Sequence, residues 1–185
     1  MENSSPRYDR VQVTLHWLIA AIVFFMIGLG LYMVELPKKW ELPPGEESVR
    51  AFYFLLHKSM GITVAMLMIL RVVWRLTHKV PPMPDTIPKW QQRAATTVHA
   101  VFYIMLLAIP LTGYLQSMYS KFHTKFWGIT LPRMAEADKL AREQFSEIHQ
   151  FLAYLLVVLI VLHVAAAIKH HLSGSGIFDR MSFKR

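Results

Sequence analysis

The nine histidines are the residues of this sequence best suited to chemistry, because it contains no cysteine and imidazole is a strong ligand for transition metals. Four of them stand near the ends of long apolar stretches: His16, His57, His149 and His163. His149 and His163 are fourteen residues apart. At about 100° and about 1.5 Å per residue, a helix carries two such side chains on nearly one face, about 21 Å apart. The spacing predicts two histidine sites at two depths of one helix.

The other two histidines supply a partner at each depth. If four helices run up and down, His16 shares its depth with His163, and His57 shares its depth with His149. Two neutral imidazoles from different helices of a bundle can hold a haem iron between them, whereas zinc prefers a compact tetrahedral cage. The pattern therefore predicts four axial ligands for two b-type haems. Hydrogen bonding between helices is the alternative, but ionisable groups inside a membrane are costly and usually functional.

Two further residues repeat the spacing of fourteen. Arg71 follows His57, which predicts a guanidinium on the ligand face at the depth of His16 and His163. There it could neutralise a haem propionate or polarise a quinone carbonyl. Gly30 follows His16 and so falls at the other depth, where it leaves room for a porphyrin ring or simply allows close helix packing.

His99 and His170 are the remaining candidates near this site. His99, near the start of the third apolar stretch, could replace a ligand, but we favour a hydrogen bond to a haem propionate. His170 follows His163 by seven residues, on nearly the same face and about 10 Å further along the helix. With Lys169 and His171 it forms either a polar stop at the membrane interface or a quinone site in which His170 donates protons.

The elements that position these residues are four membrane spans. Of the 185 residues, 54% are apolar and only 17% are charged, which is unusual for a soluble domain. Four apolar stretches are long enough to cross about 30 Å of hydrocarbon; they cover approximately 13–34, 57–76, 97–118 and 148–168. We predict an all-α integral membrane protein, a four-transmembrane-helix up-and-down bundle with two haems in its core, forming a single domain over 1–185.

Charge at the ends of the spans predicts the orientation. The net charge is +8, but the Lys and Arg residues flank apolar stretches and form no continuous stripe that would bind nucleic acid. The two termini and the middle connection hold 11 of these basic residues and the other two connections hold 9. Since basic residues favour the cytoplasmic side, we expect both termini in the cytoplasm.

The last connection contains a possible additional helix. Apolar residues recur at helical spacing between 133 and 145, at Met134, Ala137, Leu140 and Ala141. This pattern predicts a short helix lying on the membrane surface.

The order of the motifs resembles that of the bacterial cytochrome b561 family over nearly the whole chain. The segments that carry the resemblance are Leu15-His16-Trp17, Leu56-His57-Lys58-Ser59, Arg71-Val72-Val73-Trp74-Arg75, Val98-His99, Ala108-Ile109-Pro110 with Gly113, Phe126-Trp127-Gly128, and His149 with His163 and His170-His171. Each is weak alone, but their order and spacing together are specific.

The resemblance implies a di-haem b cytochrome of the bacterial inner membrane. His16 and His163 would ligate the haem on the cytoplasmic side, and His57 and His149 the haem on the periplasmic side. Among the short stand-alone members the likeness is closest to superoxide oxidase, which implies an oxidoreductase that passes electrons from periplasmic superoxide to ubiquinone.

Two other functions remain open. The chain could be only an electron carrier, a cytochrome b subunit docked to a dehydrogenase or hydrogenase. A histidine-based metal or proton transporter is less well supported, because the spans contain no Asp or Glu for a cation pathway.

Overall fold

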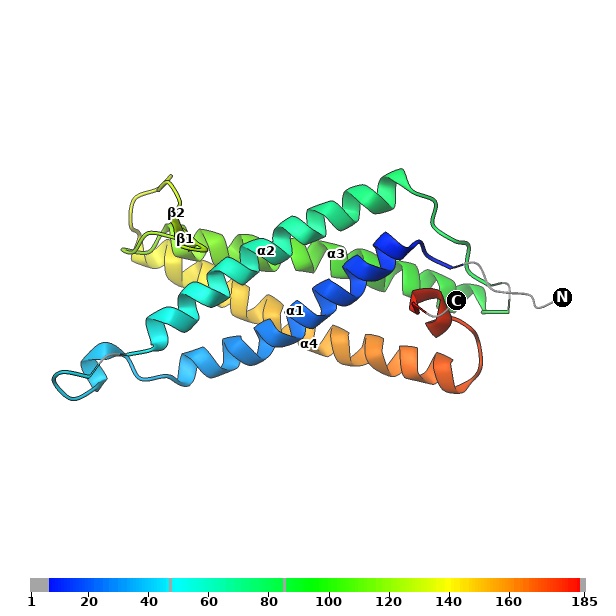
Figure 1. Ribbon diagram of the computed structural model, residues 1–185, viewed down its shortest axis with the longest axis horizontal. Helices are drawn as coiled ribbons and strands as arrows, with labels where there is room; N and C mark the ends of the chain where they lie inside the picture. The colour runs from blue at the N-terminus through cyan, green and yellow to red at the C-terminus, as the bar shows by residue number, and fades with distance from the viewer. Residues whose placement is uncertain (1–6, 47, 85, 184–185) are drawn as a thin grey trace.

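The computed structural model describes residues 7–46, 48–84 and 86–183. Four long helices dominate it (Figure 1): α1 Arg10–Glu35, α2 Arg50–Thr77, α3 Lys89–Met118 and α4 Lys139–Leu172. All four are long and apolar enough to cross a membrane. The predicted all-α membrane bundle is therefore confirmed.

Short elements lie at the helix connections. A short 3-10 helix, η1 Lys39–Glu41, follows α1, and another, η2 Phe178–Met181, follows α4. Between α3 and α4 the two-residue strands β1 Lys125–Phe126 and β2 Ile129–Thr130 form an antiparallel hairpin. Both described ends of the chain and the α2–α3 connection lie at one end of the bundle, which we call the terminal end; η1 and the hairpin lie at the other, the far end (Figure 1).

Helix starts follow local sequence signals. Asp9 caps α1 by accepting a hydrogen bond from the backbone N–H of Gln12 at 2.9 Å, and Asp138 caps α4 in the same way from Ala141 at 3.1 Å. These bonds satisfy donors that a helix start leaves unpaired. α3 begins directly after Pro88, which fits the preference of proline for the edge of a helix.

The predicted surface helix between 133 and 145 is wrong. Residues 131–138 have no helical structure, and the helical part of the pattern belongs to the first turns of α4, which begins at Lys139. Asp138, at the start of α4, explains the difference, since its capping bond places the start of the helix inside the apolar pattern.

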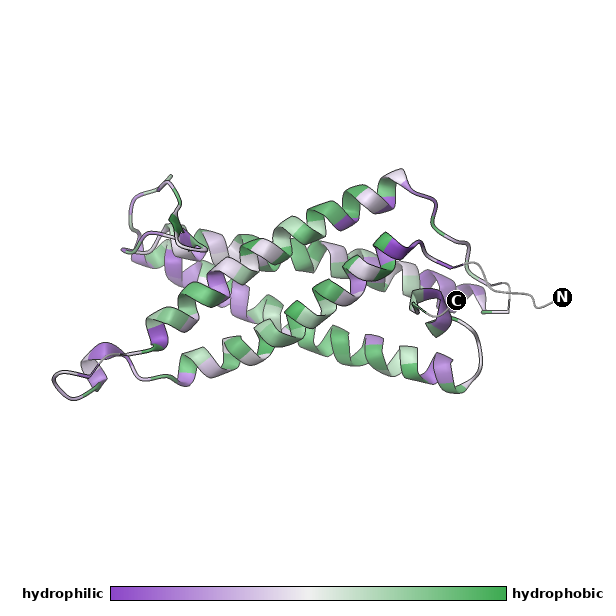
Figure 2. Cartoon of the chain, viewed as in Figure 1, coloured by the Kyte–Doolittle hydropathy of each residue, from purple (hydrophilic) through white to green (hydrophobic). Residues whose placement is uncertain are grey.

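The outside of the bundle is apolar where lipid would contact it. Large side chains such as Phe24, Ile104 and Val161 are more than half exposed. Figure 2 shows mostly hydrophobic residues along the middle of the bundle and hydrophilic ones gathered toward its ends. This distribution suits a hydrocarbon surrounding rather than water.

The interior is divided at mid-height by a small apolar core. Its buried members are Ile19, Val23, Val64, Met68, Met105 and Leu156, drawn from all four helices. Leu156 lies seven residues from both His149 and His163. The core therefore separates two layers of the bundle, one toward each end.

Candidate functional site

Two histidine pairs face each other across the bundle. His57 of α2 and His149 of α4, the far pair, have ring centres 6.2 Å apart with the ring planes at 77°. His16 of α1 and His163 of α4, the terminal pair, have ring centres 6.3 Å apart with planes at 69°. The structure thus brings together the four histidines in the two pairs expected from their spacing.

The separation within each pair fits a metal held between two imidazoles. With metal–nitrogen bonds of about 2 Å on each side, the centres of two opposed imidazole rings stand about 6 Å apart. Direct hydrogen bonding between the rings would bring them closer. No cluster of three or more His, Cys, Asp or Glu that could hold a metal occurs among the described residues. Paired rather than caged ligands are what haem requires.

Helix α4 packs mainly on α3, whereas the histidines that face its own, His16 and His57, lie on α1 and α2. Close backbone approaches join α1 to α2, α2 to α3, and α3 to α4. Both histidine pairs instead connect α4 with α1 or α2. A wide planar group needs room of this kind between helices, so the donor set and the helix spacing both fit a haem in each layer.

Each layer receives one residue from every helix. The far layer contains Gly30, His57, Gly113 and His149, and the terminal layer contains His16, Arg71, His99 and His163. On every helix the two members are fourteen residues apart. Gly113 was not predicted as a site residue, although its position fourteen after His99 was the available signal.

In the far layer the histidines lie against glycines. The ring atom Cε1 of His57 is 3.4 Å from where a Cβ on Gly30 would stand, and His149 approaches Gly113 still more closely. The Nδ1 of His149 donates a hydrogen bond to the backbone carbonyl of Ile109 at 2.9 Å. The Nδ1 of His57 is buried and has no hydrogen-bond partner within the described part of the chain.

In the terminal layer the histidines lie against polar and aromatic side chains. A guanidinium nitrogen of Arg71 is 3.0 Å from Nδ1 of His16. His99 lies edge-on to His163 with ring centres 5.8 Å apart, and Phe102 packs against the same ring at 5.3 Å. This layer therefore carries a permanent positive charge beside its histidines, which the far layer lacks at the equivalent positions.

Arg71 and Arg75 share one aromatic neighbour. Both guanidinium groups lie 5.6 Å from the centre of the Tyr103 ring. His99 lies within electrostatic range of both arginines and also of Arg180. The terminal layer thus gathers cations around a small region, an arrangement that attracts carboxylate or phosphate oxygens.

The segment after α4 folds back over the terminal end. Arg180, only 3% exposed, donates hydrogen bonds to the carbonyl of Pro81 at 2.6 Å and to Sδ of Met83 at 3.1 Å. Its guanidinium also lies over the ring of Tyr8, and the indole N–H of Trp17 donates to the carbonyl of Met181 at 2.8 Å. These contacts connect the segment to α1 and to the α2–α3 connection.

His170 lies where this returning segment begins. Its Nδ1 is 3.3 Å from Oγ of Ser175, and its backbone carbonyl accepts hydrogen bonds from Ser173 and Ser175. The ring is half-buried. Since it follows His163 by two turns, it stands on the terminal side of that residue.

At the far end, the β-hairpin is fastened to α2. Trp127 has the unusual positive φ of 47° and Gly128 follows with a φ of 91°, as tight hairpin turns require. The backbone N–H of Trp127 donates to Oγ of Ser59 at 3.0 Å, and its indole N–H donates to Oγ1 of Thr63 at 3.1 Å. The hairpin is therefore held beside the helix that carries His57.

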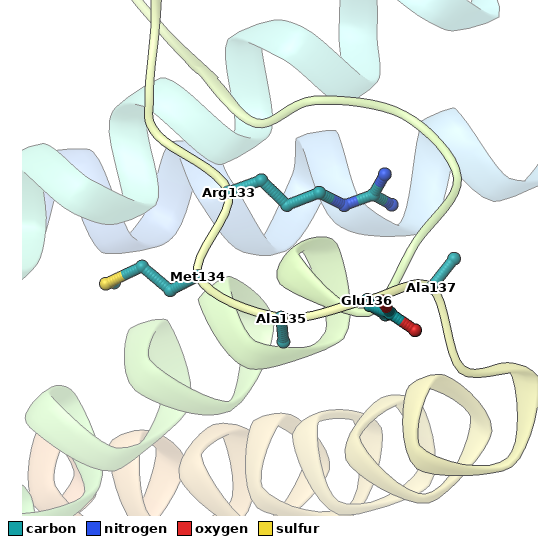
Figure 3. A pocket seen from close by; sticks show the side chains of 5 residues that line it. All are labelled: Arg133, Met134, Ala135, Glu136 and Ala137. Carbon is teal, nitrogen blue, oxygen red and sulfur yellow. The ribbon is translucent and has the colours of Figure 1, made fainter.

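An open pocket lies in the loop between β2 and α4. Figure 3 shows its lining, which consists of residues 133–137, with Arg133 and Glu136 as the charged side chains. Arg133 donates to the carbonyl of Ser120. The pocket contains no histidine, so it is separate from the two paired sites.

Comparison with known proteins gives one consistent family. The family model described as prokaryotic cytochrome b561 matches residues 7–184. "Cytochrome b561 homolog 2" of Escherichia coli (strain K12) is 35% identical over 173 residues, covering 91% of this chain and 87% of its own length. "Cytochrome b561 homolog 1" of the same organism is 29% identical over 168 residues, and "Probable superoxide oxidase CybB" of Yersinia pestis is 25% identical over 166 residues; each match covers 89% of this chain.

Proposed function

This chain belongs to the prokaryotic cytochrome b561 family, and on that premise we propose that it carries electrons from superoxide to ubiquinone through two haems b. The family establishes electron transfer by a bacterial membrane cytochrome that binds haem b. The number of haems, the donor and the acceptor are our proposal. Its main support is the matched geometry of two opposed histidine pairs at two depths of one bundle.

We assign the far pair, His57 and His149, and the terminal pair, His16 and His163, as the histidines that would ligate the two haem irons. Bound haem supplies a reversible one-electron iron couple. The carbonyl of Ile109 can only accept, so its bond with His149 keeps the proton on Nδ1 and leaves Nε2 unprotonated for a metal.

Arg71 has a distinct role in this proposal. A guanidinium only donates hydrogen bonds, so its contact with His16 requires an unprotonated Nδ1. A neutral imidazole that offers Nε2 to a metal keeps its proton on Nδ1. His16 therefore cannot accept the hydrogen bond from Arg71 and ligate a metal through Nε2 at the same time. Once His16 acts as a ligand, Arg71 is free to bind a haem propionate or a quinone carbonyl, with His99 as its polar neighbour.

The electron balance requires two donors for each acceptor. Each superoxide anion gives up one electron and becomes dioxygen, whereas ubiquinone takes two electrons and two protons to become ubiquinol. We place the quinone at the terminal end, where His170 can donate a proton and form a hydrogen bond. The bond between His170 and Ser175 would hold the ring in position for that role.

Superoxide would enter at the far end. The loop cations Lys121, Lys125 and Arg133 attract an anion, although the nearby acidic residues Glu136, Asp138 and Glu143 weaken their field. The relative named as a probable superoxide oxidase supports this choice of donor. In this arrangement the terminal end faces the cytoplasm, so both termini lie on that side of the inner membrane.

Two measurements test the proposal. A pyridine haemochrome assay on the purified protein should give two haems b per chain, and a value of zero would exclude the whole assignment. Rapid mixing of the oxidised protein with superoxide should quickly reduce the haems, as followed by the Soret and α bands. If the haems stay oxidised with superoxide but are reduced by a chemical reductant, superoxide is not the donor. A docked dehydrogenase then becomes the better candidate.

A further inference from the structure

Among the glycines of the four long helices, Gly113 is the one where an added Cβ would come nearest to a proposed ligand ring. A Cβ built on Gly113 would stand 3.0 Å from Cε1 and 3.1 Å from Nδ1 of His149. Approaches this short are tighter than nine in ten real Cβ contacts, so a larger residue here would require the imidazole to move by a few tenths of an ångström. The three nearest atoms all belong to the imidazole of His149 on α4.

The position of the ring decides which hydrogen bond it can make. The same Nδ1 that faces Gly113 donates to the carbonyl of Ile109, four residues earlier on α3. Oγ1 of Thr112 lies 3.4 Å from that Nδ1 and also donates to the Ile109 carbonyl, at 2.8 Å. One turn of α3 therefore provides both the space for the imidazole and the acceptor that fixes its proton.

We propose that Gly113 is a positioning residue for the far pair: its missing side chain lets His149 lie close to α3, where the Ile109 carbonyl holds the ring in the tautomer that leaves Nε2 free. The inference rests on the proposed role of His149 as a haem ligand. Hydrogen bonds to the outer nitrogen of a ligating histidine set its orientation and basicity. Gly113 thereby controls the orientation of one ligand of one haem.

Simple helix packing is the competing explanation, because small residues let membrane helices approach each other. It predicts a different pattern of contacts. If Gly113 served only the packing of α3 on α4, its added Cβ would meet the backbone or several side chains of α4. It meets a single imidazole instead.

Two other glycines of the bundle give a graded comparison. A Cβ on Gly28 would meet nothing within 4 Å, and a Cβ on Gly30 would stand 3.4 Å from Cε1 of His57. Alanine also has a higher helix propensity than glycine, and the resulting gain in stability is common to the glycine-to-alanine substitutions at positions 28, 30 and 113. Gly28→Ala is therefore the matched control, and Gly30→Ala tests whether the milder contact has a smaller effect.

The first experiment compares the three variants in the haem-loaded protein. Gly113→Ala should shift the midpoint potential and the ferric electron paramagnetic resonance signal of one haem, or release that haem, while the other haem remains unchanged. Gly30→Ala should cause a smaller shift, and Gly28→Ala none. Unchanged spectra in Gly113→Ala, or equal loss of both haems, would overturn the inference.

A double-mutant cycle keeps the test valid if Gly113→Ala folds poorly. The thermal unfolding of Gly113→Ala is compared with that of Gly113→Ala/His149→Ala, each against its own glycine parent. Truncating His149 removes the three atoms nearest to the new Cβ, so the decrease in unfolding temperature seen in the first pair should disappear in the second. A loss that persists without the imidazole would assign Gly113 to helix packing and refute a positioning role.

The same cycle separates this inference from the proposed function. Wild-type protein that binds no haem would refute the haem assignment, yet the coupling between Gly113 and His149 would still appear in the unfolding of the haem-free protein. Wild-type protein with two haems and no such coupling would instead refute the inference about Gly113 alone.

Discussion

The imidazoles of His57 and His149 face each other with their ring centres 6.2 Å apart and their planes nearly perpendicular, at 77°. His16 and His163 repeat this relationship at 6.3 Å and 69°. The two rings of each pair come from different helices, whose placement sets the angle between them. Their relative rotation is therefore a property of the bundle.

These angles predict the magnetic spectrum of the oxidised protein. Perpendicular axial imidazoles leave two d orbitals of a low-spin ferric iron nearly equal in energy, which produces a strongly anisotropic signal. We expect both haems to give signals of this kind in frozen-solution electron paramagnetic resonance. A rhombic spectrum typical of parallel imidazoles would contradict the ring orientations described above.

Removal of single ligands should release one haem at a time. His57→Ala or His149→Ala should lower the haem content from two per chain to one, and a combination of both should give no further loss. The apolar core between the layers supports this independence, since it separates the two pairs. Pyridine haemochrome assays measure the stoichiometry, with His123→Ala, a change at an exposed loop residue, as the control.

Arg71→Gln should lower the midpoint potential of one haem. A nearby cation disfavours the ferric state, which carries one positive charge more than the ferrous state, so loss of this guanidinium should lower the potential by roughly tens of millivolts. Redox titration with optical detection measures the shift. Arg93→Gln removes an exposed cation from the start of α3 and should leave both potentials unchanged.

Arg180→Ala should release the segment that follows α4. The buried guanidinium connects this segment to Pro81, Met83 and Tyr8, and its loss removes two hydrogen bonds and the contact with the aromatic ring. Limited proteolysis should then cleave after residue 173 at least several-fold faster than in the wild type, because cleavage follows the population of locally opened chain. Equal cleavage rates would show that other contacts hold the segment.

Asp9→Ala should destabilise the bundle by about 1 kcal/mol, as expected for the loss of a helix cap. Burial acts to raise the pKa of the Asp9 carboxyl, but hydrogen bonds from Gln12 and the Trp74 indole outweigh it, so this pKa lies below its usual value. A lowered pKa stabilises the fold above the usual value of about 4 and this contribution is lost as the pH falls further.

The difference in thermal unfolding between wild type and Asp9→Ala should therefore be constant near neutral pH and shrink below about pH 4. Asp9→Asn keeps an acceptor for both donors and should cost less than the alanine change. A difference that does not depend on pH would mean that the ionised carboxylate is not what stabilises the start of α1.

The sequence by itself determined the spans and the depths of their polar residues. Apolar length sets where a helix can cross a bilayer, and a spacing of fourteen residues keeps two side chains on one face, so His149 and His163 could be assigned to two layers before any fold was known. It did not determine the start of α4, because an apolar helical pattern continues across the cap at Asp138.

Only the tertiary structure decided what each ring contacts. Helical periodicity fixes a direction around one axis but not the distance to the next helix, which depends on side chains that are distant in sequence. Gly113 and His149 are brought together by the packing of α3 on α4, and Arg71 reaches His16 because α2 packs on α1. The depths of the site residues are thus a local property of the sequence, whereas the contacts that tune the two layers differently arise from helix packing.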